Sequence, residues 1–358
     1  MPIMLENRIG SEVKPLITIG IASYNYGTYL YRALEHIINN KTRDFEILIC
    51  DDCSSDNSIE LVEAFVEAHP DVELRLIQHE NNLGIVRNKN SIIENCRGEY
   101  LLICDSDDYM GDGLLDAARE MILKKKPDRI MTPVLHRREE TGEIIQEERF
   151  EDGQTIWGWN IFHGVFFKTS IIKENNISVL AHPDDVYFTV LYSSYSRNYE
   201  LLEGVKYYWN VHWESAGRKK TQTKNQLIKC LKSELNVFKF VCDIREHVLK
   251  EVPSENESIG ILYLKLYYYY MLYTPRGCRL KAKLWYYRQC HRMIEKYYSE
   301  YQLNRYLYDH SRILRKGTIQ KIRLCALLER LHLMPLAIIG YHILTMVVEL
   351  DQGKIVMK

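Results

Sequence analysis

Several features that define common protein classes are missing from this 358-residue chain. The nine cysteines have no repeating spacing, so they indicate neither a zinc site nor a disulfide framework, and free thiols are typical of a reducing compartment. No Gly-x-Gly-x-x-Gly follows the first apolar run at Ala22, which argues against a dinucleotide-dependent oxidoreductase. What is present is ordinary globular usage, with 46% hydrophobic and 27% charged residues, and this excludes a mostly disordered chain.

A long uninterrupted hydrophobic run is also missing. The longest apolar stretch, residues 333–350, is broken by Pro335, by polar aromatic residues and by Glu349, too often for a membrane span. The first 15 residues are polar and charged and lack the apolar core of a secretion signal. We therefore expect a cytoplasmic protein, with peripheral contact to the inner face of the plasma membrane left open.

The formal net charge of −1 conceals an uneven distribution. Residues 1–216 carry 21 Lys and Arg against 36 Asp and Glu, whereas residues 217–358 carry 26 against 12. An acidic first part can hold a cation, and a basic last part can face an anionic partner.

Apolar runs alternate with helical spacing through the first 130 residues. The pattern predicts strands at residues 16–22, 45–50, 72–77 and 100–104, each followed by a helix, at residues 29–38, 58–68, 84–96 and 113–124. This alternation indicates an α/β fold, with a parallel sheet and helices on both faces. In such sheets ligands bind beyond the carboxyl ends of the strands, so the four loops that follow the strands should form one cleft.

The rhythm changes after about residue 129. Two apolar segments around Thr141-Gly142, residues 130–137 and 144–150, predict a hairpin. Further strands are expected within 157–167 and 201–211, with a helix between them at 186–195. From about residue 220 the chain is expected to be wholly helical and is rich in Tyr, Lys and Arg.

Four acidic or polar residues directly follow the strand that ends at Cys104. In the run Asp105-Ser106-Asp107-Asp108 the three carboxylates repel one another unless a cation neutralises them, and oxygen ligands favour Mg²⁺ or Mn²⁺. The alternative is a solvated acidic turn that caps the next helix.

The other three loops carry weaker signals. Asp52 can accept hydrogen bonds from a base or ribose, or can simply hold a turn. Tyr24, next to Asn25, can stack on a flat ring or pack in the core. Arg87 lies at a helix start, where it could meet a phosphate.

These loops together resemble the family 2 glycosyltransferases. The resemblance rests on four segments in order: residues 17–25 (ITIGIASYN), 51–56 (DDCSSD), 81–88 (NNLGIVRN) and 98–108 (GEYLLICDSDD). Cys53 stands where the family most often has Gly, a departure expected to alter only the turn. The resemblance implies a GT-A fold, a mainly parallel sheet with helices on both faces, followed here by an all-α C-terminal region.

The resemblance also implies roles for single residues. The nucleotide sugar would contact Ala22, Tyr24, Asn25, Asp52, Arg87, Asp105 and Ser106. Tyr24 would stack on the base and Asp52 would bind its edge. Asp105 would contact the ribose or metal-bound water, and Asp107 would ligate the Mn²⁺ or Mg²⁺ that bridges the diphosphate.

An acidic pair before a predicted helix resembles the pair that inverting members use for catalysis. Asp185 would be the general base that takes the proton of the acceptor hydroxyl, with Asp184 in support. A helix N-cap is the alternative for Asp184.

Aromatic residues and a histidine complete the expected site. His212 would join the metal shell or contact the diphosphate, or would be structural. Trp157, Trp159 and Trp213 could form a platform for the acceptor sugar, or could pack in the core.

The basic, Tyr-rich tail lacks a nucleic-acid motif, so no nucleic-acid partner is expected. The apolar spacing between 318 and 350 predicts helices that pack on the catalytic domain, form a homodimer or contact a membrane. The expected organisation is an extension at 1–14, a nucleotide-sugar-binding half at 15–127, an acceptor-binding half at 128–218 and the helical region at 219–358.

The sequence thus predicts a metal-dependent inverting glycosyltransferase. It would move a sugar from a nucleotide donor, a UDP-sugar, to a saccharide or lipid-linked saccharide in cell-surface polysaccharide synthesis. The alternative is a non-catalytic nucleotide-sugar- or saccharide-binding protein on the same fold, whose C-terminal helices serve as a membrane or partner adaptor.

Overall fold

The computed structural model describes residues 3–7, 14–150, 161–179, 184–212, parts of 231–250, 256–273, 278–309, 314 and 316–351. The chain divides into two compact units, Met1–Phe150 with Trp159–Lys219 and Glu151–Gly158 with Lys220–Lys358. The described strands all belong to the first unit, and the described part of the second is helical.

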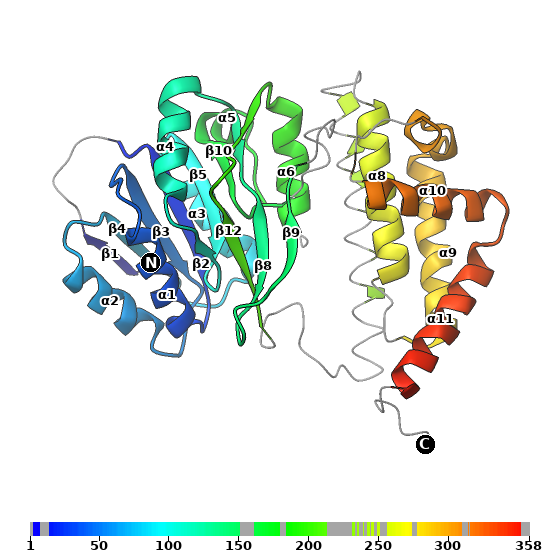
Figure 1. Ribbon diagram of the computed structural model, residues 1–358, viewed down its shortest axis with the longest axis horizontal. Helices are drawn as coiled ribbons and strands as arrows, with labels where there is room; N and C mark the ends of the chain where they lie inside the picture. Colours follow the sequence, from blue (N-terminus) through cyan, green and yellow to red (C-terminus); the bar gives the residue numbers. More distant parts are fainter. Residues whose placement is uncertain are drawn as a thin grey trace. The chain divides into compact units, whose positions relative to one another are not determined.

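An eight-stranded mixed sheet forms the centre of the first unit (Figure 1). Its order is β1 (Ile3–Asn7), β4 (Leu74–Gln78), β3 (Phe45–Asp51), β2 (Ile17–Ser23), β5 (Tyr100–Asp105), β10 (Val165–Lys168), β7 (Arg129–Met131) and β11 (Tyr199–Leu201). β4, β3, β2 and β5 run parallel, while β1 and β10 are antiparallel to their neighbours. Every residue of β2 and β3 is buried, as expected for a sheet covered on both faces.

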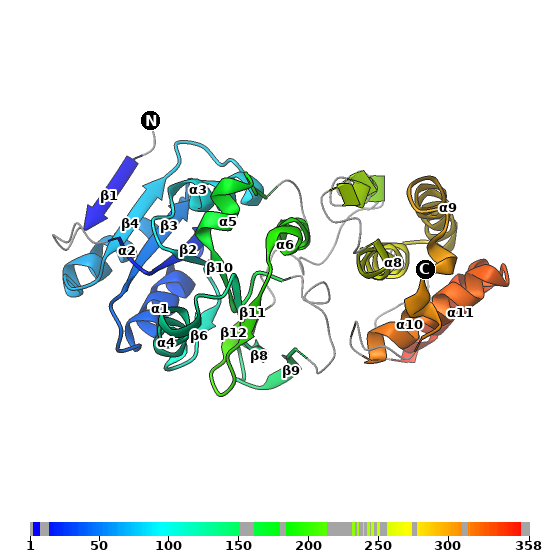
Figure 2. The same cartoon turned by 90° about the horizontal axis from the view of Figure 1, so that it is seen from above.

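Helices cover both faces of this sheet. Figure 2 shows α1 (Gly27–Ile38) and α4 (Leu114–Lys125) on one side, and α3 (Ile85–Asn95) and α5 (Thr169–Glu174) on the other. α2 (Ser58–Ala68) packs against α1. The four strand–helix pairs expected within the first 130 residues are therefore confirmed, as is the α/β class.

A second, four-stranded sheet lies beside the first. It consists of β6 (Tyr109–Met110), β12 (Tyr207–Val211), β8 (Val134–Arg138) and β9 (Ile144–Glu148), in that order. The expected hairpin is β8–β9, but the segment 130–137 is not one strand. It breaks at Thr132 and Pro133 into β7 of the main sheet and β8 of the second, because proline cannot donate a ladder hydrogen bond. The predicted strand at 201–211 is likewise divided between β11 and β12.

The second unit is built from α8 (Asn256–Tyr273), α9 (Leu280–Tyr297), α10 (Lys316–Arg330) and α11 (Met334–Asp351), with two short 3₁₀ turns at Tyr301–Leu303 and Arg305–Leu307. A buried carboxylate holds its core together. Tyr268 and Tyr301 donate to Glu329 Oε2 over 2.9 and 3.0 Å, and Tyr267 donates to Glu329 Oε1. The expectation of an all-helical tail is confirmed for its described residues.

The cysteines of the described residues are all free thiols. Cys50 and Cys53 are spaced as a Cys-x-x-Cys pair, but the Cys50 thiol is buried within β3 and burial raises its pKa to about 12. A thiol that stays protonated is a poor metal ligand or nucleophile, so this pair gives no sign of zinc or redox chemistry.

Candidate active site

The carboxyl ends of β2, β3 and β5 bring the expected residues to one edge of the main sheet. In the strand registers Ala22 lies beside Asp105, and Ser23 beside Asp51. The predicted convergence of the loops is therefore confirmed for these three strands.

Asn25 and Asp52 fix the shape of this edge through hydrogen bonds to neighbouring loops. The Asn25 backbone, in the left-handed region with φ 55°, donates to Ser54 Oγ over 2.8 Å, and its side-chain oxygen accepts from the Ser55 N–H over 2.7 Å. The buried carboxylate of Asp52 accepts from the Leu83 and Gly84 N–H groups, over 2.7 and 2.8 Å, and so holds the turn before α3. Each Asp52 oxygen retains a second lone pair for a ligand.

Cys53 lies in the same left-handed region, with φ 66°. This conformation explains why glycine suits the position, since glycine alone adopts it without steric cost. The presence of Cys53 in place of Gly thus affects only the turn, as expected.

Tyr24 and Arg87 are both exposed at this edge, and Tyr24 leaves 46% of its surface in solvent. Ser106 is buried. The exposed ring of Tyr24 is free to stack on a base, and the exposed guanidinium of Arg87 is free to contact a phosphate.

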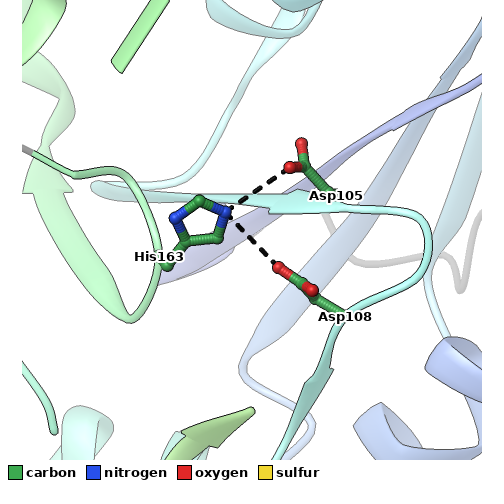
Figure 3. Close-up of side chains that lie close together, drawn as sticks. All are labelled: Asp105, Asp108 and His163. Carbon is green, nitrogen blue, oxygen red and sulfur yellow. Dashed lines mark hydrogen bonds and ion pairs between the residues drawn. The ribbon is translucent and has the colours of Figure 1, made fainter. Parts of the chain in front are cut away.

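A largely buried cluster surrounds Asp105, the last residue of β5 (Figure 3). Lys89 Nζ lies 2.9 Å from Asp105 Oδ1, and His163 Nε2 lies 3.4 Å from Asp105 Oδ2 and 3.5 Å from Asp108 Oδ2. Burial opposes ionisation of Asp105, but Lys89 and His163 together lower its pKa below the usual range. The same two carboxylates outweigh burial at His163 and raise its pKa to about 9.

Asp108 has a structural role within this cluster. Its Oδ2 accepts from the Tyr207 hydroxyl and its Oδ1 from the Asn210 N–H, both over 2.9 Å, which joins the loop after β5 to β12. Burial raises the pKa of Asp108, and the neighbouring Asp107 and Asp105 act in the same direction.

Asp107 is paired with His212. His212 Nε2 lies 2.8 Å from Asp107 Oδ2, and the imidazole stacks on Tyr29 with ring centroids 4.8 Å apart. Burial and the charge of Asp105 raise the pKa of Asp107, so a nearby cation would stabilise its charged form. A cavity of about 100 Å³ opens beside Asp107 and is also lined by Tyr29 and Asn210.

One group of three side chains in the described part of the chain could hold a divalent cation, and the Asp107–His212 pair offers two further ligand atoms. Asp105, Asp108 and His163 place one ligand atom each within 4.8 Å of one another. Their negative charge is already met by Lys89, and Asp108 is occupied by Tyr207 and by the Asn210 backbone. Among the described residues Asp107 forms no ion pair with a lysine or an arginine. Its Oδ2 lies 2.8 Å from His212 Nε2, a hydrogen-bond distance at which the two atoms could also ligate one ion. The Asp107–His212 pair is therefore the better candidate.

Sequence reasoning missed Lys89 and His163. Lys89 follows Arg87 and Asn88 on α3, and from the sequence alone a lysine in this polar run is expected to be exposed. In the structure it is buried. His163 lies 58 residues beyond Asp105 and belongs to no motif, so only the fold could place it.

Other expected residues lie where the structure gives no side-chain geometry. Asp184 and Asp185 begin helix α6 (Asp184–Tyr195), but their side chains are not described. Trp157, Trp159 and Trp213 lie outside the described residues. These roles remain predictions.

The fold is of the GT-A type, with the candidate site at the carboxyl ends of the strands. A search of solved structures supports the fold: over 88% of this chain and 92% of the other, it matches Staphylococcus aureus TarS 1-349 in complex with UDP-GlcNAc, with a TM-score of 0.67 and 17% identity. A mannosyltransferase from Pyrobaculum calidifontis, PcManGT, in complex with GDP-Man and Mn²⁺, matches with a TM-score of 0.50 and 15% identity over 89% of this chain and 88% of that one.

The family is shown by sequence. The model of glycosyl transferase family 2 matches residues 18–223, more than half of the chain, and the chain belongs to this family. The resemblance seen in the sequence is confirmed.

Curated relatives cover the chain only in part. The glycosyltransferase GlyG of Streptococcus pneumoniae is 34% identical over 113 residues, 32% of this chain and 37% of its own length. The putative glycosyltransferase EpsH of Bacillus subtilis is 26% identical over 225 residues, 56% of this chain and 62% of its own length. The chain thus spans less than two thirds of the length of these relatives.

Among the described residues, no helix is both long and apolar enough to cross a membrane.

Proposed function

We propose that this protein transfers a sugar from a UDP-linked donor to a saccharide or lipid-linked saccharide acceptor, with inversion at the anomeric carbon and with Mn²⁺ or Mg²⁺ as cofactor. The observation that carries the proposal is the 2.8 Å approach of His212 to Asp107, at the sheet edge where Asp52 and Asp105 also lie. A solved neighbour in complex with UDP-GlcNAc supports the choice of donor.

The donor would lie along the loops at the ends of β2, β3 and β5. Tyr24 would stack on the base, Asp52 would accept from the base edge, and Arg87 would contact a phosphate. Asp105 would accept from the ribose, because Lys89 and His163 keep it ionised.

Asp107 and His212 would hold the metal ion, which when bound supplies positive charge that stabilises the departing diphosphate. Asp108, through Tyr207 and Asn210, positions the loop that carries Asp107. The network restricts this loop before a ligand arrives, which lowers the cost of ordering the site.

Asp185 would take the proton from the acceptor hydroxyl while the hydroxyl oxygen bonds to the anomeric carbon. The bond between that carbon and the phosphate oxygen breaks, and its electron pair leaves with the diphosphate. Asp184, which precedes it in the first turn of α6, would support its orientation. Trp157, Trp159 and Trp213 would contact the acceptor sugar.

The setting we propose is cell-surface polysaccharide synthesis on the cytoplasmic side of the membrane. Relatives that are named chondroitin synthase and hyaluronan synthase support a polysaccharide product. The C-terminal helices would provide peripheral membrane contact or a homodimer contact.

UDP release from a panel of UDP-sugars, with and without Mn²⁺, tests this proposal. Asp107→Asn and Asp185→Asn should each lower turnover by about a hundredfold or more, whereas Asp71→Asn, an exposed acid remote from the sheet edge, should not. Parental turnover in both site variants would refute the assigned roles.

A further inference from the structure

Helices α10 and α11 present apolar side chains to solvent. Eight large apolar residues of the described part of these helices and the turn between them are between 37% and 63% exposed: Leu324, Leu327, Leu331, Leu333, Leu336, Tyr341, Ile343 and Leu344. We name this set the α10–α11 face. Monomeric proteins rarely leave so many large apolar side chains together in water without a binding purpose.

The opposite face of α10 is already used. Ile319, Ile322, Cys325 and Ala326 are buried, and α10 packs against α8 and α11. The core of the second unit therefore does not need the exposed leucines, which lie at helical spacing on the other side of α10.

The charge along α10 and most of α11 has one sign, and the acids Glu349 and Asp351 stand only at the C-terminal end of α11. Between residues 310 and 348 the chain holds six Lys and Arg and a single acid, Glu329. Glu329 is buried and bound by three tyrosine hydroxyls, so it gives the surface no anionic group. Lys321 and Arg330 are exposed, and no acidic partner is found for either within the described residues.

We propose that the α10–α11 face binds the surface of an anionic lipid bilayer. The leucines would enter the boundary between headgroups and acyl chains, and Lys321 and Arg330 would bind the headgroup phosphates. The helices would lie on the membrane, since neither is long and apolar enough to cross it. The inference rests on the proposed function, which gives the C-terminal helices either a membrane contact or a homodimer contact. It chooses the membrane contact.

A second copy of the chain fits this face less well. Pairing two such faces would bring the lysines and arginines of both copies together with no surface acid between residues 310 and 348 to neutralise them. An anionic bilayer supplies the missing charge.

Vesicle co-sedimentation of the full chain tests the proposal. Phosphatidylcholine vesicles that contain phosphatidylglycerol should bind the protein at low salt, and pure phosphatidylcholine vesicles should bind it at least tenfold less. Lys321→Glu with Arg330→Glu should weaken binding by about fivefold or more for each charge. Leu336→Gln with Leu344→Gln should weaken it by about tenfold or more for each leucine.

Matched controls come from α4 of the first unit. Leu123→Gln and Lys124→Glu alter an exposed leucine and an exposed lysine outside the α10–α11 face and should leave vesicle binding unchanged. UDP release with a soluble acceptor should also persist in every variant, so a failure of this inference is distinguishable from a failure of the transferase assignment.

Two results would overturn the inference. One is equal binding of parent and face variants to anionic vesicles. The other is a dimer in sedimentation velocity that Leu336→Gln with Leu344→Gln dissociates, together with no vesicle binding by the parent, which would assign the face to a second copy.

Discussion

The imidazole Nε2 of His212 lies 2.8 Å from the Oδ2 of Asp107, although 105 residues separate them in the chain. His212 directly follows β12, and Asp107 lies in the loop after β5. Asp108 joins these segments by accepting hydrogen bonds from Tyr207 and Asn210 of β12. Asp108, which we do not expect to bind metal, therefore holds Asp107 and His212 close together.

Replacing His212 with Gln should weaken Mn²⁺ binding in the presence of UDP by at least about tenfold, because an imidazole ligand is lost while a polar group remains. Free Mn²⁺ can be measured by electron paramagnetic resonance during a titration. His69→Gln removes a partly exposed histidine beside Glu35 and serves as the control. Unchanged Mn²⁺ affinity in the His212 variant would remove it from the metal site.

Lys89→Met should destabilise the first unit by about 1–3 kcal/mol, because the partly buried Asp105 carboxylate loses one cationic partner while His163 remains. Urea unfolding measures the loss. The double variant with Asp105→Asn should recover part of it, since the unpaired carboxylate is then gone. If the two single losses simply add, Lys89 and Asp105 are not coupled.

Gly164→Ala should displace the adjacent His163. An added Cβ would stand 2.3 Å from Thr132 Oγ1 and 2.9 Å from Tyr207 Cβ. Gly204→Ala is a matched control, because Gly204 also has positive φ but nothing lies within 4 Å of its Cβ position. The Gly164 variant should lose about 1–3 kcal/mol more in urea unfolding than the control. Equal losses would mean that only the backbone conformation matters.

His291 should make the stability of the second unit depend on pH. Its hydrogen bond to Glu329 raises the pKa of His291, and Glu295 acts in the same direction. Because the charged form is favoured in the folded state, the stabilisation is complete below about pH 6.5 and is lost as the pH rises through the raised value.

The expected size is about 1 kcal/mol or less, since the pair is partly solvated. Urea unfolding of parent and His291→Gln, followed upward from about pH 6, should show the decline in the parent alone. Parallel declines in both proteins would contradict the assignment.

Local patterns were enough to predict the parallel strands and their helices. A continuous apolar run such as the one in β2 predicts a strand that is buried on both faces of a parallel sheet. The loops that follow such strands then lie at the same edge of the sheet. Patterns failed where a strand changes sheets, as at Pro133, because apolar content does not say which sheet a short strand joins.

The candidate site was predictable where residues follow strand ends. Asp52, Asp105 and Asp107 could be named, since topology fixes their position. Lys89 and His163 could not, because a buried lysine on a helix and an isolated histidine gain their roles only from tertiary contacts with Asp105.

The most direct measurement is an anomalous difference map at the manganese edge, from crystals of the protein soaked with UDP and Mn²⁺. We expect one peak within ligand distance of Asp107 and His212, beside the diphosphate. A peak at Asp105, Asp108 and His163 instead, or a diphosphate bound away from both groups, would contradict this account of the site.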